Sequence, residues 1–125
     1  MNGVAFTKDE AKVTVLRVPD VPGVAAKLFG PLAEANVNVD MIVQNISPDG
    51  KTTDMTFTVP HADLIKTQEV VKSQAVFKDS EIRIDPDVTK VSVVGIGMRS
   101  HAGVAQIMFT ALADKGINIQ VISTS

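Results

Sequence analysis

The sequence contains an internal repeat with a spacing of 80 residues. Residues 23–45 align with residues 103–125 without a gap, and eight of the 23 aligned positions are identical. The apolar stretch before each repeat also recurs, as KVTV at residues 12–15 and KVSV at residues 90–93. Each copy therefore predicts the same strand, turn and helix, and a chain that uses one such unit twice is expected to form two related units.

The first copy predicts the element order β-α-β-β-α-β. Stretches rich in β-branched and apolar residues predict strands at residues 12–18, 37–46, 53–59 and 82–84. Apolar residues at helical spacing predict helices at residues 22–35 and 61–77. Four strands with two helices on one face make an α+β, ferredoxin-like sandwich. We expect a linker at Pro86, and the second strand is expected to place on one face Val37, Val39, Met41 and Val43.

The second copy predicts only half of this unit. A strand at residues 91–96, a helix at 102–115 and a strand at 117–123 are followed by the end of the sequence. An unpaired sheet edge and an uncovered apolar face would remain, so we expect a fragment or a chain that is completed by a partner. The expected organisation is a first unit at residues 12–88, a half unit at 89–125, and an N-terminal strand at 1–11 that pairs with the second unit.

Composition narrows the classes of function. A net charge of −2 and an aromatic content of 4% argue against a nucleic-acid partner, which needs clustered Lys and Arg and platforms for base stacking. The absence of cysteine excludes disulfides, thiolate metal sites and a catalytic thiol. No apolar run approaches the roughly 18–20 residues that span a bilayer, and no signal peptide is evident. We therefore expect no membrane partner and a cytoplasmic location.

A self-contained small enzyme would need a nucleophile with its base, paired carboxylates or a metal site. No such constellation stands out in the sequence. His61 and His101 each lie at a predicted helix start without a nearby set of ligands, and both are expected at the surface. The sequence therefore predicts neither a catalytic residue nor a metal site.

The turn before each predicted helix contains a glycine, Gly23 in the first copy and Gly103 in the second. The first N–H groups of a helix have no partner within the helix and carry the positive end of its dipole. Glycine lets a ligand approach the main chain there, and a carboxylate suits the position. The alternative stays open that Asp20 or Val21, and Ser100 in the second copy, only cap the helices while the glycines only allow close packing.

The strand after the first helix ends in polar residues. Gln44, Asn45 and Ser47 crowd this end, and Asn38 and Asp40 precede them. The second copy has related residues at Asn118, Gln120, Thr124 and Ser125. Solvation of a half-exposed strand explains such residues. Alternatively, if the first and second strands are antiparallel, this end lies near the helix start, where amide, hydroxyl and carboxylate groups would suit a small zwitterion.

Four stretches carry a resemblance to a known family: VDMIVQNIS at residues 39–47, TTDMTFTV at 52–59, KVSVVGIGMRSHAGV at 90–104 and ISTS at 122–125. Together with the repeated turns they resemble the tandem ACT domains at the C-terminus of bacterial aspartokinase. The resemblance covers the chain from Gly3 onward. It implies that the second ACT domain is cut short and that the kinase domain is absent, as in a separate regulatory β subunit or a cloned fragment.

The resemblance also implies a function. Aspartokinase phosphorylates aspartate with ATP, and its ACT domains bind lysine, threonine or both at interfaces between subunits. No catalysis and no cofactor are then expected in this chain, since ATP and Mg²⁺ would belong to the kinase domain. The implied partners are the effector and either a second copy or the catalytic subunit. A ligand that bridges two subunits would favour the closed, inhibited state that it binds better.

Matching motifs carry over a set of effector-binding residues: Asp20, Gly23, Val24, Asp40, Gln44, Asn45, Ser47 and Thr56 in the first unit, and Asn118, Ile119, Ser123, Thr124 and Ser125 in the second. The helix-start N–H groups would hold the effector carboxylate, while Asp20 and Asp40 would face its ammonium group. Acidic residues at positions 20 and 40 favour lysine, and Gln44 with Asn118 suits threonine. The effector stays open, as does a module that serves only subunit assembly.

Overall fold

The computed structural model describes residues 3–94 and 101–116. The chain divides into two compact units, one formed by Lys8–Val88 and the other by Met1–Thr7 together with Thr89–Ser125. The domain boundaries expected from the sequence, after residues 11 and 88, stay predictions.

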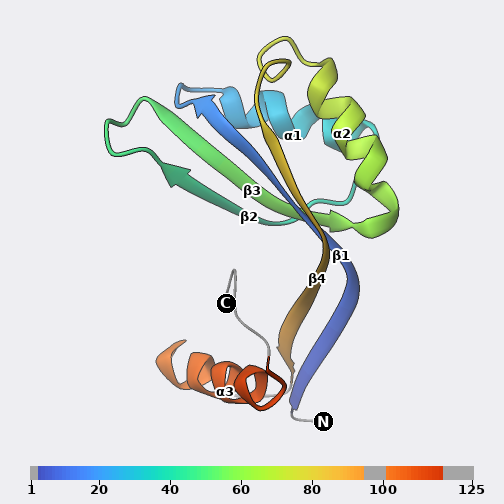
Figure 1. Ribbon diagram of the computed structural model, residues 1–125, viewed down its shortest axis with the longest axis vertical. Helices are drawn as coiled ribbons and strands as arrows, with labels where there is room; N and C mark the ends of the chain where they lie inside the picture. The colour runs from blue at the N-terminus through green and yellow to red at the C-terminus, as the bar shows by residue number, and fades with distance from the viewer. Residues whose placement is uncertain (1–2, 95–100, 117–125) are drawn as a thin grey trace. The chain divides into compact units, whose positions relative to one another are not determined.

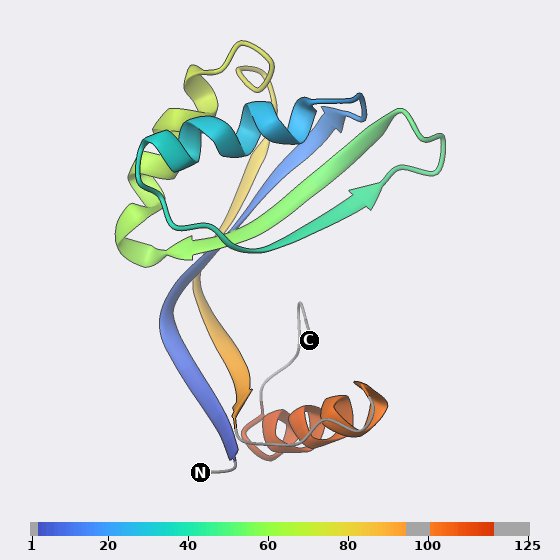
Figure 2. The same cartoon turned by 180° about the vertical axis from the view of Figure 1, so that it is seen from behind.

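The elements of the described chain follow the predicted order. They are β1 (Gly3–Pro19), α1 (Val24–Glu34), β2 (Asp40–Ile46), β3 (Thr52–Pro60), a 3₁₀ helix (His61–Asp63), α2 (Leu64–Ser73), β4 (Ile82–Val94) and α3 (His101–Asp114). The strands form one sheet in the order β2-β3-β1-β4, and α1 and α2 cover the same face of it (Figures 1 and 2). The predicted ferredoxin-like α+β fold is confirmed.

Strand β3 lies between two antiparallel neighbours. It pairs with β1 from Glu10↔Pro60 to Pro19↔Thr52, and with β2 from Asp40↔Thr58 to Ile46↔Thr53. Because β1 and β2 are both antiparallel to β3, they run parallel to each other. The C-terminal ends of β1 and β2 therefore lie at the same end of the sheet.

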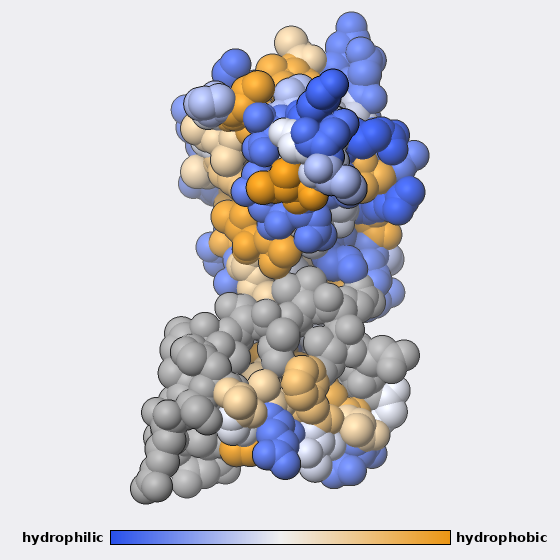
Figure 3. Space-filling view, turned by 90° about the vertical axis from the view of Figure 1, so that its left-hand side faces the viewer, coloured by the Kyte–Doolittle hydropathy of each residue, from blue (hydrophilic) through white to orange (hydrophobic). Residues whose placement is uncertain are grey.

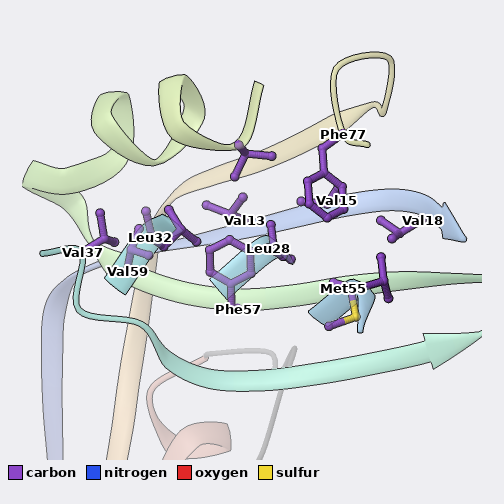
Figure 4. Packing of buried hydrophobic residues seen from close by; sticks show 13 residues of the cluster. Val13, Val15, Val18, Leu28, Leu32, Val37, Met55, Phe57, Val59 and Phe77 are labelled. Carbon is purple, nitrogen blue, oxygen red and sulfur yellow. The ribbon is translucent and has the colours of Figure 1, made fainter. Parts of the chain in front are cut away.

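The core lies between the helices and the sheet. Every second residue of β3 is buried, including Met55, Phe57 and Val59, because side chains along a strand alternate between its two faces. Leu28 and Leu32 of α1 are buried against this face, since a four-residue spacing places both on one side of the helix. Figure 4 shows these side chains pointing toward one another between sheet and helices.

The expected break at Pro86 is wrong. Strand β4 continues from Ile82 to Val94, so the predicted strands at residues 82–84 and 91–96 are parts of one strand, with residues 95 and 96 outside the described chain. Proline lacks the N–H that an interior strand needs, but it is tolerated at a sheet edge, and β4 is an edge strand. The Pro86 carbonyl lies 2.8 Å from Nδ1 of His61, which is exposed as expected.

The helix predicted at residues 102–115 is confirmed as α3, which belongs to the second unit. Val104, Met108 and Leu112 repeat every four residues and are buried. In the same unit, Nζ of Lys115 lies 5.2 Å from the centroid of the Phe6 ring, which joins the N-terminal segment to the end of this helix. The strand predicted at residues 117–123 lies outside the described residues.

We expect Phe57→Ala to destabilise the first unit strongly. Phe57 is 1% exposed, and its ring packs edge-on against Phe29 with the centroids 5.3 Å apart. Loss of a buried phenylalanine and the resulting cavity lower the free energy of unfolding by about 3–5 kcal/mol, measurable by urea denaturation. Ile65→Ala is the control, because Ile65 is 72% exposed and its truncation should cost less than about 0.5 kcal/mol. Equal losses would contradict this description of the core.

Candidate functional site

The turn between β1 and α1 begins the helix without a side-chain cap. Gly23 is the N-cap residue, with φ 87°, and no side chain caps the helix there. The expected cap at Asp20 or Val21 is therefore wrong, and Ser100 of the second copy lies outside the described residues. A Cβ at Gly23 would meet nothing within 4 Å, so it is the left-handed backbone that favours glycine at this position.

Asp20 and Gln44 meet beside this turn. Nε2 of Gln44 donates a hydrogen bond to Oδ1 of Asp20 at 3.4 Å, and the main-chain N–H of Asp20 is held by the Lys51 carbonyl at 3.0 Å. The prediction that the end of β2 lies near the helix start is confirmed, but the antiparallel arrangement given for it is wrong. The two strands are parallel to each other, and for this reason their C-terminal ends coincide.

Two other predicted residues lie on the opposite face of the sheet. Residues directly opposite each other in an antiparallel pair share a face. Gln44 lies opposite the buried Met55, on the helix-covered face, whereas Asn45 lies opposite Asp54. Thr56 shares the face of Asn45, and its hydroxyl oxygen lies 3.0 Å from that of Thr14. Asn45 and Thr56 therefore do not converge with Asp20 and Gln44 within this unit.

The expected face of β2 changes at Met41. Met41 has φ 49°, and the register with β3 shifts between Asp40 and Ile42. This bulge places Ile42 opposite the buried Phe57 and puts Val43 on the other face. The expectation that Val37, Val39, Met41 and Val43 share one face is therefore wrong.

Asp40 lies at the far end of β2 from the Asp20–Gln44 contact. Asp40 is paired with Thr58 of β3, whereas Pro19, which precedes Asp20, is paired with Thr52. Thr52 and Thr58 are six residues apart along an extended strand, which is a distance of about 20 Å. One Asp40 oxygen accepts the N–H of Met41 at 3.1 Å. The expectation that Asp20 and Asp40 face one ammonium group is therefore wrong within a single unit.

Ser47 organises the hairpin that connects β2 and β3. Its hydroxyl donates to Oδ1 of Asp49 at 2.6 Å, and the same carboxylate oxygen accepts the N–H of Lys51 at 2.9 Å. The Ser47 hydroxyl also accepts the N–H of Thr52 at 3.2 Å. Lys51 in turn provides the carbonyl that holds Asp20. Ser47 thus supports the site through the hairpin.

Comparison with known proteins identifies the family. The sequence profile of the ACT domain matches residues 12–76, and a second ACT-domain profile matches residues 91–125. The chain belongs to the ACT-domain family. The chain is 49% identical to a chain in the crystal structure of aspartokinase alpha and beta subunits (TM-score 0.82), and the match covers 98% of this chain and 80% of that chain. It is 39% identical to the ligand-free regulatory subunit of aspartate kinase from Thermus thermophilus (TM-score 0.84), covering 98% of this chain and 81% of the other.

Full-length relatives agree with this assignment. The chain is 55% identical to an aspartokinase from Pseudomonas aeruginosa and 49% identical to one from Helicobacter pylori, in each case over 100% of this chain and 30% of the relative. It thus spans 30% of the length of the curated relatives that it matches. These ACT units correspond to the regulatory region of aspartokinase.

The remaining residues that were predicted to bind an effector are Val24 and the five residues of the second unit. Val24 is 6% exposed and packs in the core, and its main-chain N–H already donates to the Val21 carbonyl at 3.3 Å. The residues carried over in the second unit lie outside the described chain: Asn118, Ile119, Ser123, Thr124 and Ser125. Among residues 3–94 and 101–116, no cluster of His, Cys, Asp or Glu could hold a metal ion, and no helix is long and apolar enough to cross a membrane.

Sequence reasoning missed two residues that hold the main chain at or just before Asp20. Lys51 acts through its carbonyl, which any residue could supply, so the sequence gives no signal for it. Asp54 accepts the main-chain N–H of Arg17 at 2.9 Å. A carboxylate in the midst of the alternating TTDMTFTV strand was the available signal, because aspartate is disfavoured in strands.

The carboxylate of Asp49 in the hairpin has a pKa below its usual 3.8. The main cause is the hydrogen bond from the Ser47 hydroxyl, and the second is the one from the Lys51 N–H. A lowered pKa in the folded state stabilises the hairpin above pH 3.8, and this contribution is lost as the pH falls through the folded-state pKa. We expect Ser47→Ala to raise the pKa of Asp49 toward its usual value in an NMR titration of the carboxyl carbon. Ser73→Ala, which removes an exposed hydroxyl from α2, should leave it unchanged. An unchanged pKa in Ser47→Ala would contradict this role.

Proposed function

We propose that this chain is the amino-acid-sensing, non-catalytic part of an aspartokinase. In this proposal it binds lysine, threonine or both where ACT units of two subunits meet, and so mediates feedback inhibition of aspartate phosphorylation. The observation that carries the proposal is the contact of Asp20 with Gln44 beside the start of α1, which no side chain caps. Membership in the aspartokinase regulatory family supports it.

The groups beside the turn fit the ends of a free amino acid. The N–H of Val24 already donates to the Val21 carbonyl at 3.3 Å, so the effector carboxylate would use the later N–H groups of the first turn of α1 and the positive end of the helix dipole. The carboxylate of Asp20 suits an ammonium group, and the Gln44 amide can donate to or accept from a further polar atom. Asp20 lies within hydrogen-bond distance of Gln44 at 3.4 Å, so an effector that enters between them would exchange this contact for its own.

Lysine and threonine are both retained as effectors. The crystal structure of E. coli aspartokinase III contains lysine and aspartate, but at 20% identity the likeness extends to the fold alone. A second ammonium group on lysine would need a counter-charge, which Asp40 can provide only from a different unit than Asp20. Threonine would need only the groups beside the turn. The choice rests on titration of both amino acids.

Regulation would follow from unequal binding to two states of the assembly. A ligand shifts a conformational equilibrium only by its difference in affinity for the two states. A site completed by a second ACT unit has this property, because separation of the subunits removes one wall of it. The catalytic reaction, its ATP and its Mg²⁺ are assigned to the part of aspartokinase outside this chain. We place the protein in the cytoplasm, where its proposed effectors are made.

A second candidate function is assembly without effector binding. Val21 is 55% exposed, Ile42 54% and Ile46 59%, and all three lie near the edge strand β2 or the adjacent turn. Figure 3, which views the hairpin end of the molecule, shows apolar surface among the polar residues of this unit. An edge strand with exposed isoleucines can pair with another chain. Assembly through ACT units would bury these residues with or without an amino acid.

Isothermal titration with L-lysine and L-threonine, separately and together, tests the sensor proposal. We expect Asp20→Ala to raise the Kd of the bound amino acid at least about tenfold, because a hydrogen bond to a charged group contributes about 1.5–3 kcal/mol. Gln44→Ala should raise it about two- to tenfold, because it removes a neutral hydrogen bond.

The matched controls replace an aspartate and a glutamine that lie elsewhere on the surface. Asp79→Ala and Gln68→Ala remove an exposed aspartate and an exposed glutamine away from the turn, and both should bind as the wild type does. Full affinity in both Asp20→Ala and Gln44→Ala would reject this site. No heat with either amino acid, in a chain that still assembles, would favour the assembly function.

Assembly is tested by analytical ultracentrifugation. We expect the wild-type chain to sediment as a dimer and Ile46→Lys to shift it toward the monomer, because a charge would be buried at the β2 edge. Ile65→Lys is the matched control, since Ile65 of α2 is 72% exposed and far from β2 in the sequence. A dimer that survives Ile46→Lys unchanged would place the interface elsewhere.

A further inference from the structure

Two bulges interrupt the sheet on either side of β3. Between Val15 and Val18, β1 uses one residue more than the paired segment of β3. Between Asp40 and Ile42, β2 likewise uses one residue more than β3. Each bulge contains a residue other than glycine with a left-handed backbone, Arg17 at φ 54° in β1 and Met41 at φ 49° in β2.

The bulge in β1 reverses the face on which the following residues lie. Side chains alternate along a strand, so after the buried Val13 and Val15 an uninterrupted strand would bury Arg17 and expose Val18. Instead Val18 is 0% exposed and Arg17 lies at the surface. The alternation then continues from Val18, which turns Asp20 toward the helix-covered face.

The bulge in β2 does the same for Gln44. Asp40 is paired with Thr58 on the far face, yet Gln44, an even number of residues later, lies opposite Met55 on the helix-covered face. Without either one of the bulges, Asp20 and Gln44 would lie on opposite faces of the sheet. Their contact at 3.4 Å therefore depends on both.

Each bulge is held by an aspartate carboxylate. Oδ1 of Asp54 accepts the N–H of Arg17 at 2.9 Å, and Oδ1 of Asp40 accepts the N–H of Met41 at 3.1 Å. The extra residue of a bulge has no ladder partner, and a left-handed backbone is unfavourable for a residue with a Cβ. A carboxylate that accepts this N–H satisfies the donor and stabilises the backbone at the same position.

We propose that Asp54 is a positioning residue for the effector site. Its carboxylate fixes the β1 bulge at Arg17, and the bulge turns Asp20 toward Gln44. Asp54 itself lies on the other face of the sheet, opposite Asn45, and so acts on the site only through the main chain. The positioning role stands on the fold alone, whereas its effect on affinity rests on the proposed function.

Hydrogen exchange and NMR on the full chain test the positioning role without any effector. Asp54→Ala should accelerate exchange of the Arg17 amide at least about tenfold, because a hydrogen bond to a charged group is lost. The neighbouring Leu16 amide is an internal control, since it donates to the Glu81 carbonyl at 2.9 Å on the other side of β1. The side-chain amide resonances of Gln44 should shift in Asp54→Ala and remain in place in Asp79→Ala.

Two further variants, Asp54→Asn and Arg17→Gly, distinguish loss of the hydrogen bond to Arg17 from a non-specific loss of stability. Asparagine keeps an oxygen acceptor, so Asp54→Asn should retain the wild-type resonances of Gln44. Glycine adopts a left-handed backbone readily, even when no carboxylate accepts its N–H. Arg17→Gly should therefore restore the Gln44 resonances in the Asp54→Ala background. If Asp54→Ala alone does not fold, the double variant and Asp54→Asn decide. Unchanged Gln44 resonances in Asp54→Ala, or no rescue by Arg17→Gly, would overturn the proposal.

Titration with L-lysine and L-threonine then connects the bulge to binding. Asp54→Ala should raise the Kd about tenfold while Asp54→Asn and Asp79→Ala bind as the wild type does. A wild-type chain that binds neither amino acid would reject the proposed function, and the Gln44 resonances would still decide the positioning role. Unchanged affinity in Asp54→Ala, with displaced Gln44 resonances, would reject the link between the bulge and the effector.

Discussion

The pairing of β3 with both of its neighbours determines where the functional groups of the first unit lie. Its register with β1 and β2 brings the C-terminal ends of these strands to one end of the sheet. The alternation of side chains then assigns each residue to the core or to the far face. Two single-residue bulges change that assignment at Arg17 and Met41, and the Asp20–Gln44 contact exists because both changes occur.

Most elements of the fold could be predicted because their signals are local and periodic. The four-residue spacing of Leu28 and Leu32 and the alternation through Met55 and Phe57 each mark a buried face. The continuation of β4 through Pro86 could not be predicted, since the effect of proline depends on whether its strand is interior or at an edge. Strand order is a tertiary property, and no local pattern in this stretch specifies it.

The candidate site could be predicted only in part. The prediction that the turn and the polar end of β2 lie close together is confirmed, whereas Asp40 lies at the other end of β2 and not beside Asp20. Neither bulge could be found from the sequence, because arginine and methionine give no sign of a left-handed backbone. The aspartate at position 54 stands out in its alternating strand, but nothing in the sequence shows that its carboxylate accepts the N–H of Arg17 in β1.

Pro86 has a consequence for how many chains can associate. In edge strand β4 it supplies no N–H, and its carbonyl already lies 2.8 Å from Nδ1 of His61, so a foreign strand finds no continuous ladder there. Strand β2, at the other edge, contains no proline and exposes Ile42 and Ile46. A sheet that can be extended at one edge only forms a closed pair, whereas two extendable edges would permit a growing fibre. If the sheets associate through the β2 edge as proposed, the proline at the other edge leaves no second ladder from which the pair could grow.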